Sequence, residues 1–323
     1  MRIEAWIAAG FLVCGAGGAT AADTIRLAAQ RTGTLAWEVD VIKYHRLDVA
    51  AGIDLEIVPV ATPGSQKVAL MGGSADIIVS DWTWVARQRA LGADILFHPF
   101  SSTLGAVMVP SQSPIRTIAD LRGKKLAIAG GPLDKSWLLL RALALRGGSD
   151  LTQDLTPVYG APALLAAKAR QGEVDAMLNY WQFCAVLEAQ GFRRLIGMDE
   201  VQKKLGATGP VAILGYVFSR KWADSNRQAV DRFLAMTRKA KDVLDKSDAE
   251  WVRISGLTGA ADKDVLEVLR RRYREGIPRR GIAEEARDAA ALFRVLAETG
   301  GTRLTGPAKT IDAAAFYSAQ PGN

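Results

Sequence analysis

Two short segments of the chain share one pattern and end in side chains that can bind a small molecule. The first is residues 73–82 (GSADIIVSDW), and the second, about a hundred residues later, is residues 172–181 (GEVDAMLNYW). Their last three residues are Ser80-Asp81-Trp82 and Asn179-Tyr180-Trp181. Hydroxyl, carboxylate and amide groups hydrogen-bond a ligand, and aromatic rings stack on flat groups or hold cations. The pattern therefore predicts binding chemistry at two places.

The residues before these tips predict how the tips are positioned. Glycine can adopt the left-handed conformation that ends a helix, so Gly73 and Gly172 each mark a helix end. The apolar runs 77–79 and 176–178 suit strands that are buried on both faces of a parallel sheet. Because ligands of open α/β sheets bind beyond the carboxyl ends of the strands, the two units predict two similar lobes around one cleft.

Three further loops follow predicted strands and are expected to reach this cleft, namely residues 32–37, 62–65 and 130–136. The Gly130-Gly131 loop before a helix is typical of places where free backbone N–H groups and the helix dipole hold an anion. Hydroxyl donors from Thr34 and Ser136 would suit a sulfonate or a carboxylate.

The charges and rings of these loops are mixed. Asp81 and Asp134 would oppose an anion unless Lys135 or Arg31 offsets them. Four aromatic residues could stack a flat ring or hold a cation, namely Trp37, Trp82, Tyr180 and Trp181. The mixture favours an organic ligand with an aromatic or cationic part over a small oxyanion such as nitrate.

Structural roles compete with these binding roles. The tryptophans are equally consistent with packing beneath the loops as core. Asp81 and Asp134 stand where an aspartate can cap the following helix, so capping and ligand contact stay open for both. Asp76 and Asp175 are instead predicted to shape the turns before their strands.

The sequence offers little for catalysis, and we predict no catalytic residue, no metal site and no cofactor. The two histidines, His45 and His98, are far apart and in no metal-ligand spacing. The sequence contains no nucleophile elbow, phosphate-loop lysine or HExxH motif.

The amino terminus is typical of a secretory signal peptide. Arg2 precedes an apolar stretch at 5–13, and Ala19-Thr20-Ala21 offers the small residues that a signal peptidase reads, with cleavage expected after Ala21 or Ala22. Cys14 lacks the small residue expected before a lipidated cysteine, so a lipid anchor is not favoured. The mature protein is expected to be exported, with Cys184 as its one cysteine and therefore no internal disulfide.

Length and composition suit two domains, since the chain has 323 residues of which 49% are hydrophobic. Strands and helices alternate, including a helix from about 36 to 50 and a strand at 211–218. This alternation predicts a parallel sheet in each half. We expect a signal peptide at 1–22, a first lobe at 23–105 plus 208–323, and a second lobe at 106–207. The net charge of +7 owes much to an arginine run at 270–280, which is predicted to be a solvated or partner-facing helix surface and not a nucleic-acid site.

Three elements, taken in order behind the signal peptide, resemble one family. They are residues 118–125 (IADLRGKK) before the strand at 126–129, the two Gly-x-x-Asp strand leaders, and Thr310-Ile311-Asp312 with Phe316. They resemble the type II periplasmic solute-binding proteins of ABC importers. The most similar branch is the nitrate/sulfonate/taurine group, which includes binders of thiamine-pyrimidine precursors.

The resemblance implies an α/β fold of two lobes, each a mostly parallel sheet flanked by helices, joined by two crossover strands. It implies a monomeric periplasmic protein that delivers a small organic ligand to an ABC permease and its ATPase in the inner membrane. The ligand would be sulfonate-, pyrimidine- or amine-like, or a chelate. The matching loop positions imply these ligand-binding residues: Thr32, Gly33, Thr34, Trp37, Thr62, Gly64, Ser65, Ser80, Asp81, Trp82, Gly131, Asp134, Lys135, Ser136, Asn179, Tyr180 and Trp181.

Two alternatives stay open. One branch of similar fold is a pyrimidine-synthase-like enzyme, but that branch carries a cysteine-rich segment and works inside the cell. The other alternative is a periplasmic ligand sensor, which would use the same closing cleft.

Overall fold

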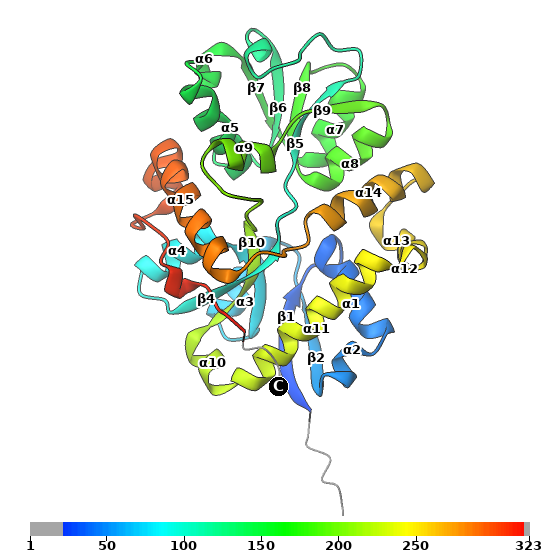
Figure 1. Ribbon diagram of the computed structural model, residues 1–323, viewed down its shortest axis with the longest axis vertical. Coiled ribbons are helices and arrows are strands. Elements are labelled where there is room, and N and C mark those ends of the chain that lie inside the picture. Colours follow the sequence, from blue (N-terminus) through cyan, green and yellow to red (C-terminus); the bar gives the residue numbers. More distant parts are fainter. Residues whose placement is uncertain (1–21, 320–323) are drawn as a thin grey trace, which may run out of the picture.

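The computed structural model describes residues 22–319, which form two five-stranded sheets flanked by helices (Figure 1). The first sheet has the order β2-β1-β3-β10-β4, with β1 (Asp23–Ala29), β2 (Ile53–Pro59), β3 (Ile77–Asp81), β4 (Ile95–Ser101) and β10 (Leu214–Ser219). The second has the order β7-β6-β8-β5-β9, with β5 (Ala106–Pro110), β6 (Lys125–Ala129), β7 (Thr156–Gly160), β8 (Ala176–Asn179) and β9 (Phe192–Gly197). Except for Ala22, the predicted signal peptide lies outside the described residues.

One strand in each sheet runs against its neighbours. β10 is antiparallel to β3 and β4, and β5 is antiparallel to β8 and β9, whereas β1 and β6 pair in parallel with their neighbours. The chain enters the second sheet through β5 and returns to the first through β10. Strand β8 is buried along its whole length, as expected for a strand covered on both faces. The predicted architecture of two mostly parallel lobes with two crossover strands is confirmed.

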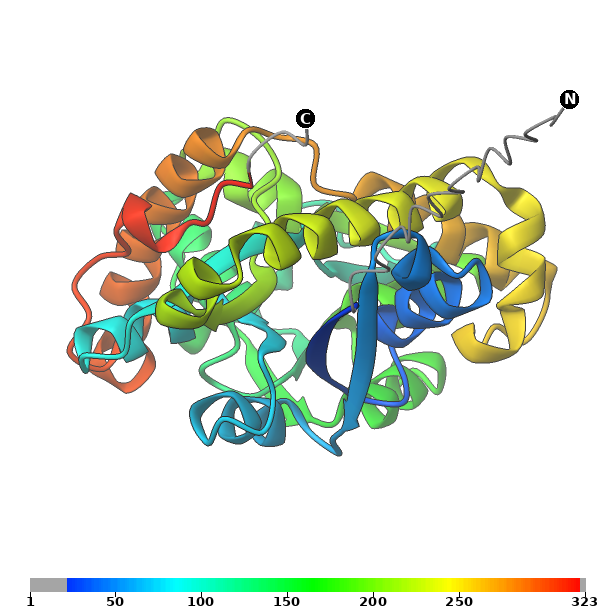
Figure 2. The ribbon, with the colours of Figure 1, turned by 90° about the horizontal axis from the view of Figure 1, so that it is seen from below.

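Helices cover both faces of each sheet (Figures 1 and 2). Their bounds are α1 (Thr34–Tyr44), α2 (Leu47–Ala50), α3 (Pro63–Met71), α4 (Trp82–Ala90), α5 (Lys135–Arg146), α6 (Leu151–Asp154), α7 (Pro162–Arg170), α8 (Trp181–Ala189), α9 (Met198–Lys204), α10 (Arg220–Ser225), α11 (Arg227–Lys246), α12 (Asp248–Arg253), α13 (Ser255–Thr258), α14 (Lys263–Glu275) and α15 (Ile282–Thr305). Within residues 22–319, none of these helices has the length and apolarity needed to cross a bilayer.

The two repeated segments have the same structure. Gly73 and Gly172 adopt φ values of 74° and 73°, in the left-handed region that the turn after each helix requires. Asp76 accepts a hydrogen bond from the backbone N–H of Arg26 on β1 at 2.8 Å, and Asp175 accepts one from Lys125 on β6 at 2.7 Å. Each aspartate therefore joins the start of its strand to the neighbouring strand, which is a structural role but a different one from the predicted shaping of the turns.

Three predicted elements differ from the structure. The predicted helix at 36–50 is wrong, because the chain breaks between α1 and α2 at Arg46, which adopts a left-handed φ of 52°. The predicted strand at 211–218 begins only at Leu214. Strand β9 and helix α9 form in a stretch for which the sequence pattern predicted no element.

The carboxyl-terminal helices contact both lobes. Helix α14 packs on α8 and helix α15 packs on α5 (Figure 1). The connection between α14 and α15 crosses the region between the sheets, where the Gly276 carbonyl accepts a hydrogen bond from the Ser102 backbone N–H at 2.9 Å. Because α14 and α15 contact helices of the second lobe although they follow the return to the first, the predicted lobe boundaries stay a prediction.

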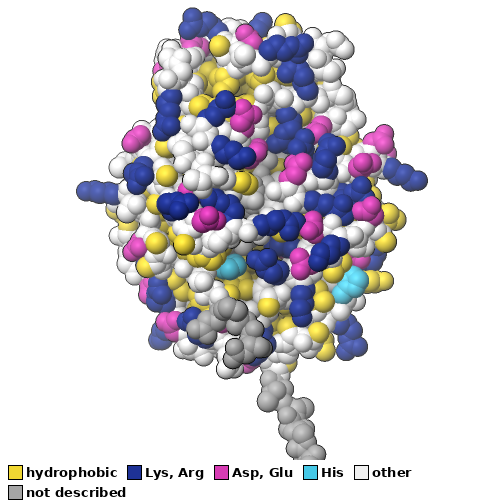
Figure 3. Space-filling view, in the orientation of Figure 1, with side chains coloured by type: hydrophobic (Ala, Val, Ile, Leu, Met, Phe, Trp, Pro, Cys, Tyr) yellow, Lys and Arg dark blue, Asp and Glu magenta, His cyan; other side chains and the backbone are white. Residues whose placement is uncertain are grey.

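Much of the arginine run forms ion pairs with other parts of the fold, and its role as a solvated or partner-facing helix surface stays a prediction. Arg272 binds Glu188 of α8 at 2.7 Å, Arg270 binds Asp248 at 2.7 Å, and Arg280 binds Asp288 at 2.7 Å. On the face in Figure 3, basic side chains are interspersed with acidic ones.

Candidate ligand-binding cleft

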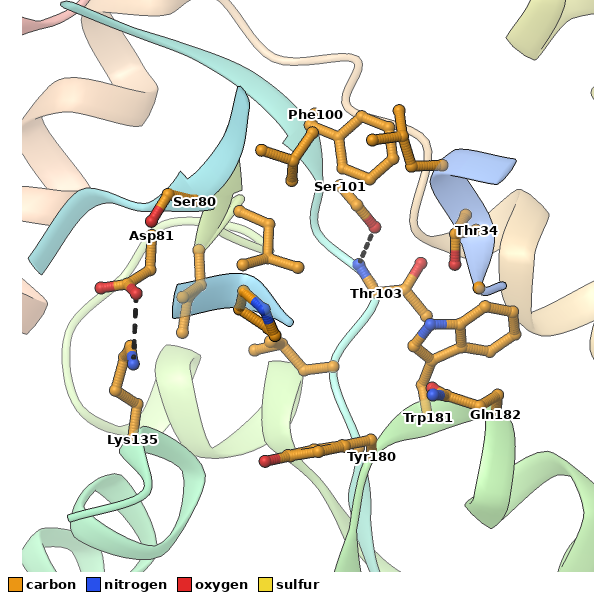
Figure 4. A pocket seen from close by; sticks show the side chains of 18 of the residues that line it. Thr34, Ser80, Asp81, Phe100, Ser101, Thr103, Lys135, Tyr180, Trp181 and Gln182 are labelled. Atoms are coloured by element: carbon orange, nitrogen blue, oxygen red, sulfur yellow. Dashed lines mark hydrogen bonds and ion pairs between the residues drawn. The ribbon is translucent and has the colours of Figure 1, made fainter. Parts of the chain in front are cut away.

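A cavity of about 480 Å³ lies between the two sheets, beyond the carboxyl ends of β1 and β3. The first lobe lines it with the loop after β1, the start of α3, the end of β3 and the segment after β4. The second lobe lines it with the first residues of α5 and α8 (Figure 4). Its size is in the range of sites that hold small organic molecules.

Two helices reach one end of this cavity with uncapped amino termini. Among the residues described, no side chain caps α1, which follows Gly33, or α8, which follows Tyr180. Thr34 of α1 and Trp181 and Gln182 of α8 line the cavity (Figure 4). The first N–H groups of a helix lack intrahelical acceptors, and the helix dipole makes this end positive. This end of the cavity therefore presents backbone donors from both lobes.

Aromatic packing sets the positions of these two helix ends. The ring of Trp37 on α1 lies edge-on to that of Trp181 on α8, with centroids 5.8 Å apart. Trp37 is 3% exposed, and its indole N–H donates to the Leu257 carbonyl at 3.0 Å. Trp37 is therefore a packing residue that supports the cavity wall.

The opposite end of the cavity is charged. Asp81 caps α4 by accepting from the Trp84 N–H at 2.9 Å, and it also accepts from the Thr83 hydroxyl. Its second oxygen faces Lys135 Nζ of the second lobe at 3.5 Å and Lys67 Nζ at 3.9 Å. Burial by itself would raise the pKa of Asp81, but the two lysines and these hydrogen bonds hold it below its ordinary value.

Asp134 caps the second helix at this end. It accepts from the Ser136 N–H at 2.9 Å and the Trp137 N–H at 3.2 Å, so the amino end of α5 is already occupied by a carboxylate. Burial raises the pKa of Asp134 even though Lys135 and the two N–H groups favour its charge. Neither Gly130 nor Gly131 lines the cavity, and the predicted anion site at this loop stays a prediction.

Apolar side chains separate the two ends. Figure 4 shows the rings of Phe100 and Tyr180 between the two ends, and Leu104, Ile213 and Leu214 are further apolar residues of the cavity lining. Burial, followed by the charge of Asp134, raises the pKa of Tyr180 to about 12, so its hydroxyl stays protonated near neutral pH. The cavity thus has donors at one end, an apolar middle and a charged far end.

A buried ion pair lies beneath the cavity and fixes α1. Glu38 of α1 accepts from Lys241 Nζ at 2.5 Å and from the Tyr273 hydroxyl at 2.9 Å, and its other oxygen lies 3.5 Å from the Tyr216 hydroxyl. The Lys241 ammonium lies 4.1 Å from the centre of the Phe100 ring, which lines the cavity. Burial raises the pKa of Glu38 and lowers that of Lys241. The position of Thr34 on α1 therefore depends on this network.

Comparison with known proteins identifies the family. Residues 49–248 match the family model described as NMT1/THI5 like. The chain belongs to the NMT1/THI5-like family. A relative from Escherichia coli (strain K12), named a putative aliphatic sulfonates-binding protein, is 33% identical over 167 residues. That match covers 50% of this chain and 48% of the relative, so the chain matches about half the length of this curated protein.

Solved structures of similar fold place this family member among periplasmic binding folds. The periplasmic aliphatic sulphonate binding protein SsuA from Escherichia coli superposes with a TM-score of 0.73 at 22% identity, covering 93% of this chain and 94% of that one. The alkanesulfonate-binding protein SsuA from Xanthomonas axonopodis pv. citri, bound to MOPS, gives 0.65 at 23% identity, covering 91% and 98%. Identities this low establish the fold alone, and the predicted two-lobed fold is confirmed.

The cavity lining includes ten of the seventeen residues that the resemblance implied. These ten are Thr32, Gly33, Thr34, Ser80, Asp81, Asp134, Lys135, Ser136, Tyr180 and Trp181. Their contact with a ligand stays a prediction. For Asp81 and Asp134 both open interpretations apply, because each caps a helix and also lines the cavity.

The other seven residues lie outside the cavity lining, namely Trp37, Thr62, Gly64, Ser65, Trp82, Gly131 and Asn179. Trp82 is fully buried against Phe293 as core, and Thr62 caps α3 by accepting from the Ser65 N–H at 3.1 Å. Asn179 is 2% exposed, donates to the Pro162 carbonyl and accepts from the Tyr180 N–H. Strand-end position alone does not separate residues that face the cleft from those that secure the loops.

Several lining residues were not predicted, and Lys67, Gln182 and Phe100 are the most informative of them. Lys67 lies one turn into α3 and Gln182 directly follows the second repeated segment, so a window one helical turn beyond each strand end would have included both. Phe100 lies on β4, and its ring packs edge-on against Tyr216 of the neighbouring strand β10. Within residues 22–319, no group of three or more His, Cys, Asp or Glu side chains is placed to hold a metal ion.

Proposed function

We propose that this protein is the periplasmic substrate-binding component of an ABC importer and that it binds an organic sulfonate between its lobes. The observation that carries the proposal is the pair of uncapped helix amino termini, one from each lobe, at the same end of the cavity. A sulfonate has three acceptor oxygens, so it can accept hydrogen bonds from both helices at once. The name of the curated relative, a putative aliphatic sulfonates-binding protein, supports the same ligand class.

The apolar middle of the cavity suits the organic part of such a ligand. Phe100, Leu104 and the ring of Tyr180 offer surface to an alkyl chain or a ring, which a bare oxyanion such as nitrate would leave unused. Because the two donor helices belong to different lobes, a bound sulfonate favours the arrangement in which both reach it. Ligand then shifts the population toward a closed form, which a permease can distinguish from the open one.

The donor end can be tested with one isosteric change. Gln182→Glu adds a negative charge beside the open end of α8 without changing side-chain size, so it should repel an anion held there. We expect the affinity for butane-1-sulfonate, measured by calorimetry on the mature protein, to fall by at least about tenfold, which corresponds to about 1.4 kcal/mol.

The matched control is Gln190→Glu at the exposed far end of the same helix. It adds the same charge away from the cavity and should leave the affinity unchanged. Failure of the wild-type protein to bind any organic sulfonate would refute the proposed ligand class. An unchanged affinity in Gln182→Glu would show that the sulfonate does not lie between α1 and α8. Absence of compaction in small-angle scattering at saturating ligand would refute the closure step.

A further inference from the structure

The charged end of the cavity contains a serine whose hydroxyl is unused. Ser80 is 4% exposed and lines the cavity at the end of β3, yet its Oγ has no hydrogen-bond partner among the residues described. A buried hydroxyl without a partner has lost its hydrogen bonds to water without replacement, which costs free energy. A ligand group at this end would restore the hydrogen bond.

The charges beside Ser80 indicate which group would bind. Both oxygens of Asp81 are engaged, one with Trp84 N–H and Thr83, and the other with the two lysines. The lysine ammonium groups lie 3.5 and 3.9 Å from that oxygen, beyond the length of a strong charge-assisted hydrogen bond. Each Nζ can therefore donate further hydrogen bonds to a ligand. Asp81, Lys67 and Lys135 together have a net charge of +1.

The surrounding groups do not reverse this balance. Asp134 also lines this end, and its ionised form would bring the sum to zero, but burial raises the pKa of Asp134 and one of its oxygens caps α5. Burial lowers the pKa of Lys67, and repulsion from Lys135 and Arg87 lowers it further against the attraction of Asp81. An additional cation here would increase this repulsion, whereas an additional anion would relieve it.

We propose that Ser80, Lys67 and Lys135 form a second anion subsite, so that the preferred ligand is a sulfonate whose other end bears a carboxylate or a second sulfonate. This inference rests on the proposed function, because it assigns the first sulfonate to the donor end formed by α1 and α8. The ligand's second anionic group accepts from the Ser80 hydroxyl and from both ammonium groups. The apolar middle holds the chain that joins the two anionic groups. The Asp81 oxygen that both ammonium groups face offsets part of their mutual repulsion.

The test compares ligands that differ only in the tail. Calorimetry on the mature protein would use alkane-1-sulfonates, ω-sulfoalkanoates and ω-aminoalkane-1-sulfonates, each at three matched chain lengths. At the best length we expect the carboxylate tail to bind at least about tenfold more tightly than the alkyl tail, since a hydrogen bond to a charged group contributes about 1.5–3 kcal/mol. The ammonium tail should bind most weakly.

Variants then assign the preference to residues. Ser80→Ala should reduce the ratio of carboxylate-tail to alkyl-tail affinity by about three- to tenfold, consistent with loss of one hydrogen bond. Lys67→Met with Lys135→Met should bring that ratio close to one, and Lys168→Met on the exposed face of α7 is the matched control. The double variant leaves Asp81 without its cations, so a thermal melt must show that it is folded. Ser80→Ala provides the test if it is not.

The outcomes separate the two proposals. Equal affinities for carboxylate and alkyl tails in the wild-type protein, or a preference for the ammonium tail, would overturn the second anion subsite and leave the sulfonate-binding proposal standing. Failure of every sulfonate to bind would overturn the proposed function and with it this inference.

Discussion

The two lobes secure strands β3 and β8 in the same way, but they differ in which helices at the cleft are capped. Asp76 and Asp175 each bind the backbone of the neighbouring strand. In the first lobe, α1 after β1 is uncapped and α4 after β3 is capped by Asp81. In the second lobe, α5 after β6 is capped by Asp134 and α8 after β8 is uncapped.

The two lobes face each other so that the uncapped helix termini meet and the aspartate-capped helix termini meet. Helix α1 meets α8 through Trp37 and Trp181, and α4 meets α5 through Asp81 and Lys135. The open termini therefore lie at one end of the cavity and the acid-capped termini at the other. The two lobes share one framework, but their helices differ in the N-cap residue. This difference makes the two ends of the site chemically unlike.

The lobes also differ one layer below the cleft, and this difference predicts the largest effect. Glu38 is the fifth residue of α1 and Leu139 is the fifth residue of α5, so the two occupy equivalent positions in their helices. Leu139 packs in an apolar core, whereas Glu38 needs Lys241. Lys241→Met should lower the free energy of unfolding by about 3–5 kcal/mol, because it leaves a buried carboxylate without its cation. Urea unfolding measures this change.

A second variant separates loss of charge pairing from loss of packing. Glu38→Gln combined with Lys241→Met removes both charges but keeps an acceptor for the Tyr273 hydroxyl, and should recover more than half of the lost stability. A cost below about 1 kcal/mol for Lys241→Met alone would show that the pair is not what holds α1 in place.

The shared strand anchors predict a smaller effect that differs between the lobes. The hydrogen bond from Arg26 N–H to Asp76 is partly buried, whereas the one from Lys125 N–H to Asp175 is exposed to solvent. Water can replace the second acceptor more readily than the first. Asp76→Ala should therefore cost about 1–2 kcal/mol and Asp175→Ala about 0.5–1 kcal/mol in urea unfolding.

Asp54→Ala on the exposed side of β2 is the matched control and should be neutral. Asp76 also pairs with the Arg26 guanidinium, so equal costs for Asp76→Ala and Asp175→Ala would mean that neither burial nor this ion pair strengthens the anchor. A larger cost for Asp175→Ala would reverse the comparison between the lobes.

The repeated framework could be predicted from the sequence because it depends on local signals. Gly73 and Gly172 need a left-handed φ, and the apolar runs after them suit buried strands, so neighbouring residues determine both units. The break at Arg46 could not be predicted, since arginine at positive φ has no sequence signature of its own.

The site was only partly predictable, because its two ends depend on contacts between distant segments. Nothing local distinguishes Trp181, which lines the cavity, from Trp82, which packs against Phe293 of α15. Similarly, the packing of Phe100 depends on β10 returning to the first sheet beside β4. The uncapped state of α8 follows from Tyr180 at its N-cap and was readable in principle, since tyrosine cannot cap a helix as aspartate does.

An effect similar in size to that at Asp175 is expected for the two capping aspartates, whose pKa values shift in opposite directions. Burial would raise the pKa of Asp81, but Lys135, Lys67 and hydrogen bonds lower it overall, whereas burial raises the pKa of Asp134 overall. A carboxyl whose folded pKa is lowered stabilises the fold above its unfolded pKa and loses that contribution as pH falls through the folded value. A carboxyl whose folded pKa is raised opposes folding as pH rises above its unfolded pKa.

Substituting each aspartate with asparagine, which retains a capping acceptor, should therefore reveal opposite pH dependences. Asp81→Asn should lower the free energy of unfolding near pH 7 by on the order of 1 kcal/mol, and this loss should shrink as pH falls below about 4. Asp134→Asn should instead become more favourable, relative to wild type, as pH rises from about 4 to 7. Urea unfolding across this range tests both, and parallel pH profiles for the two variants would mean that the lysines do not distinguish the two caps. Opposite profiles would place the positive charge of the far end beside Asp81, where the second anionic group of the ligand is proposed to bind.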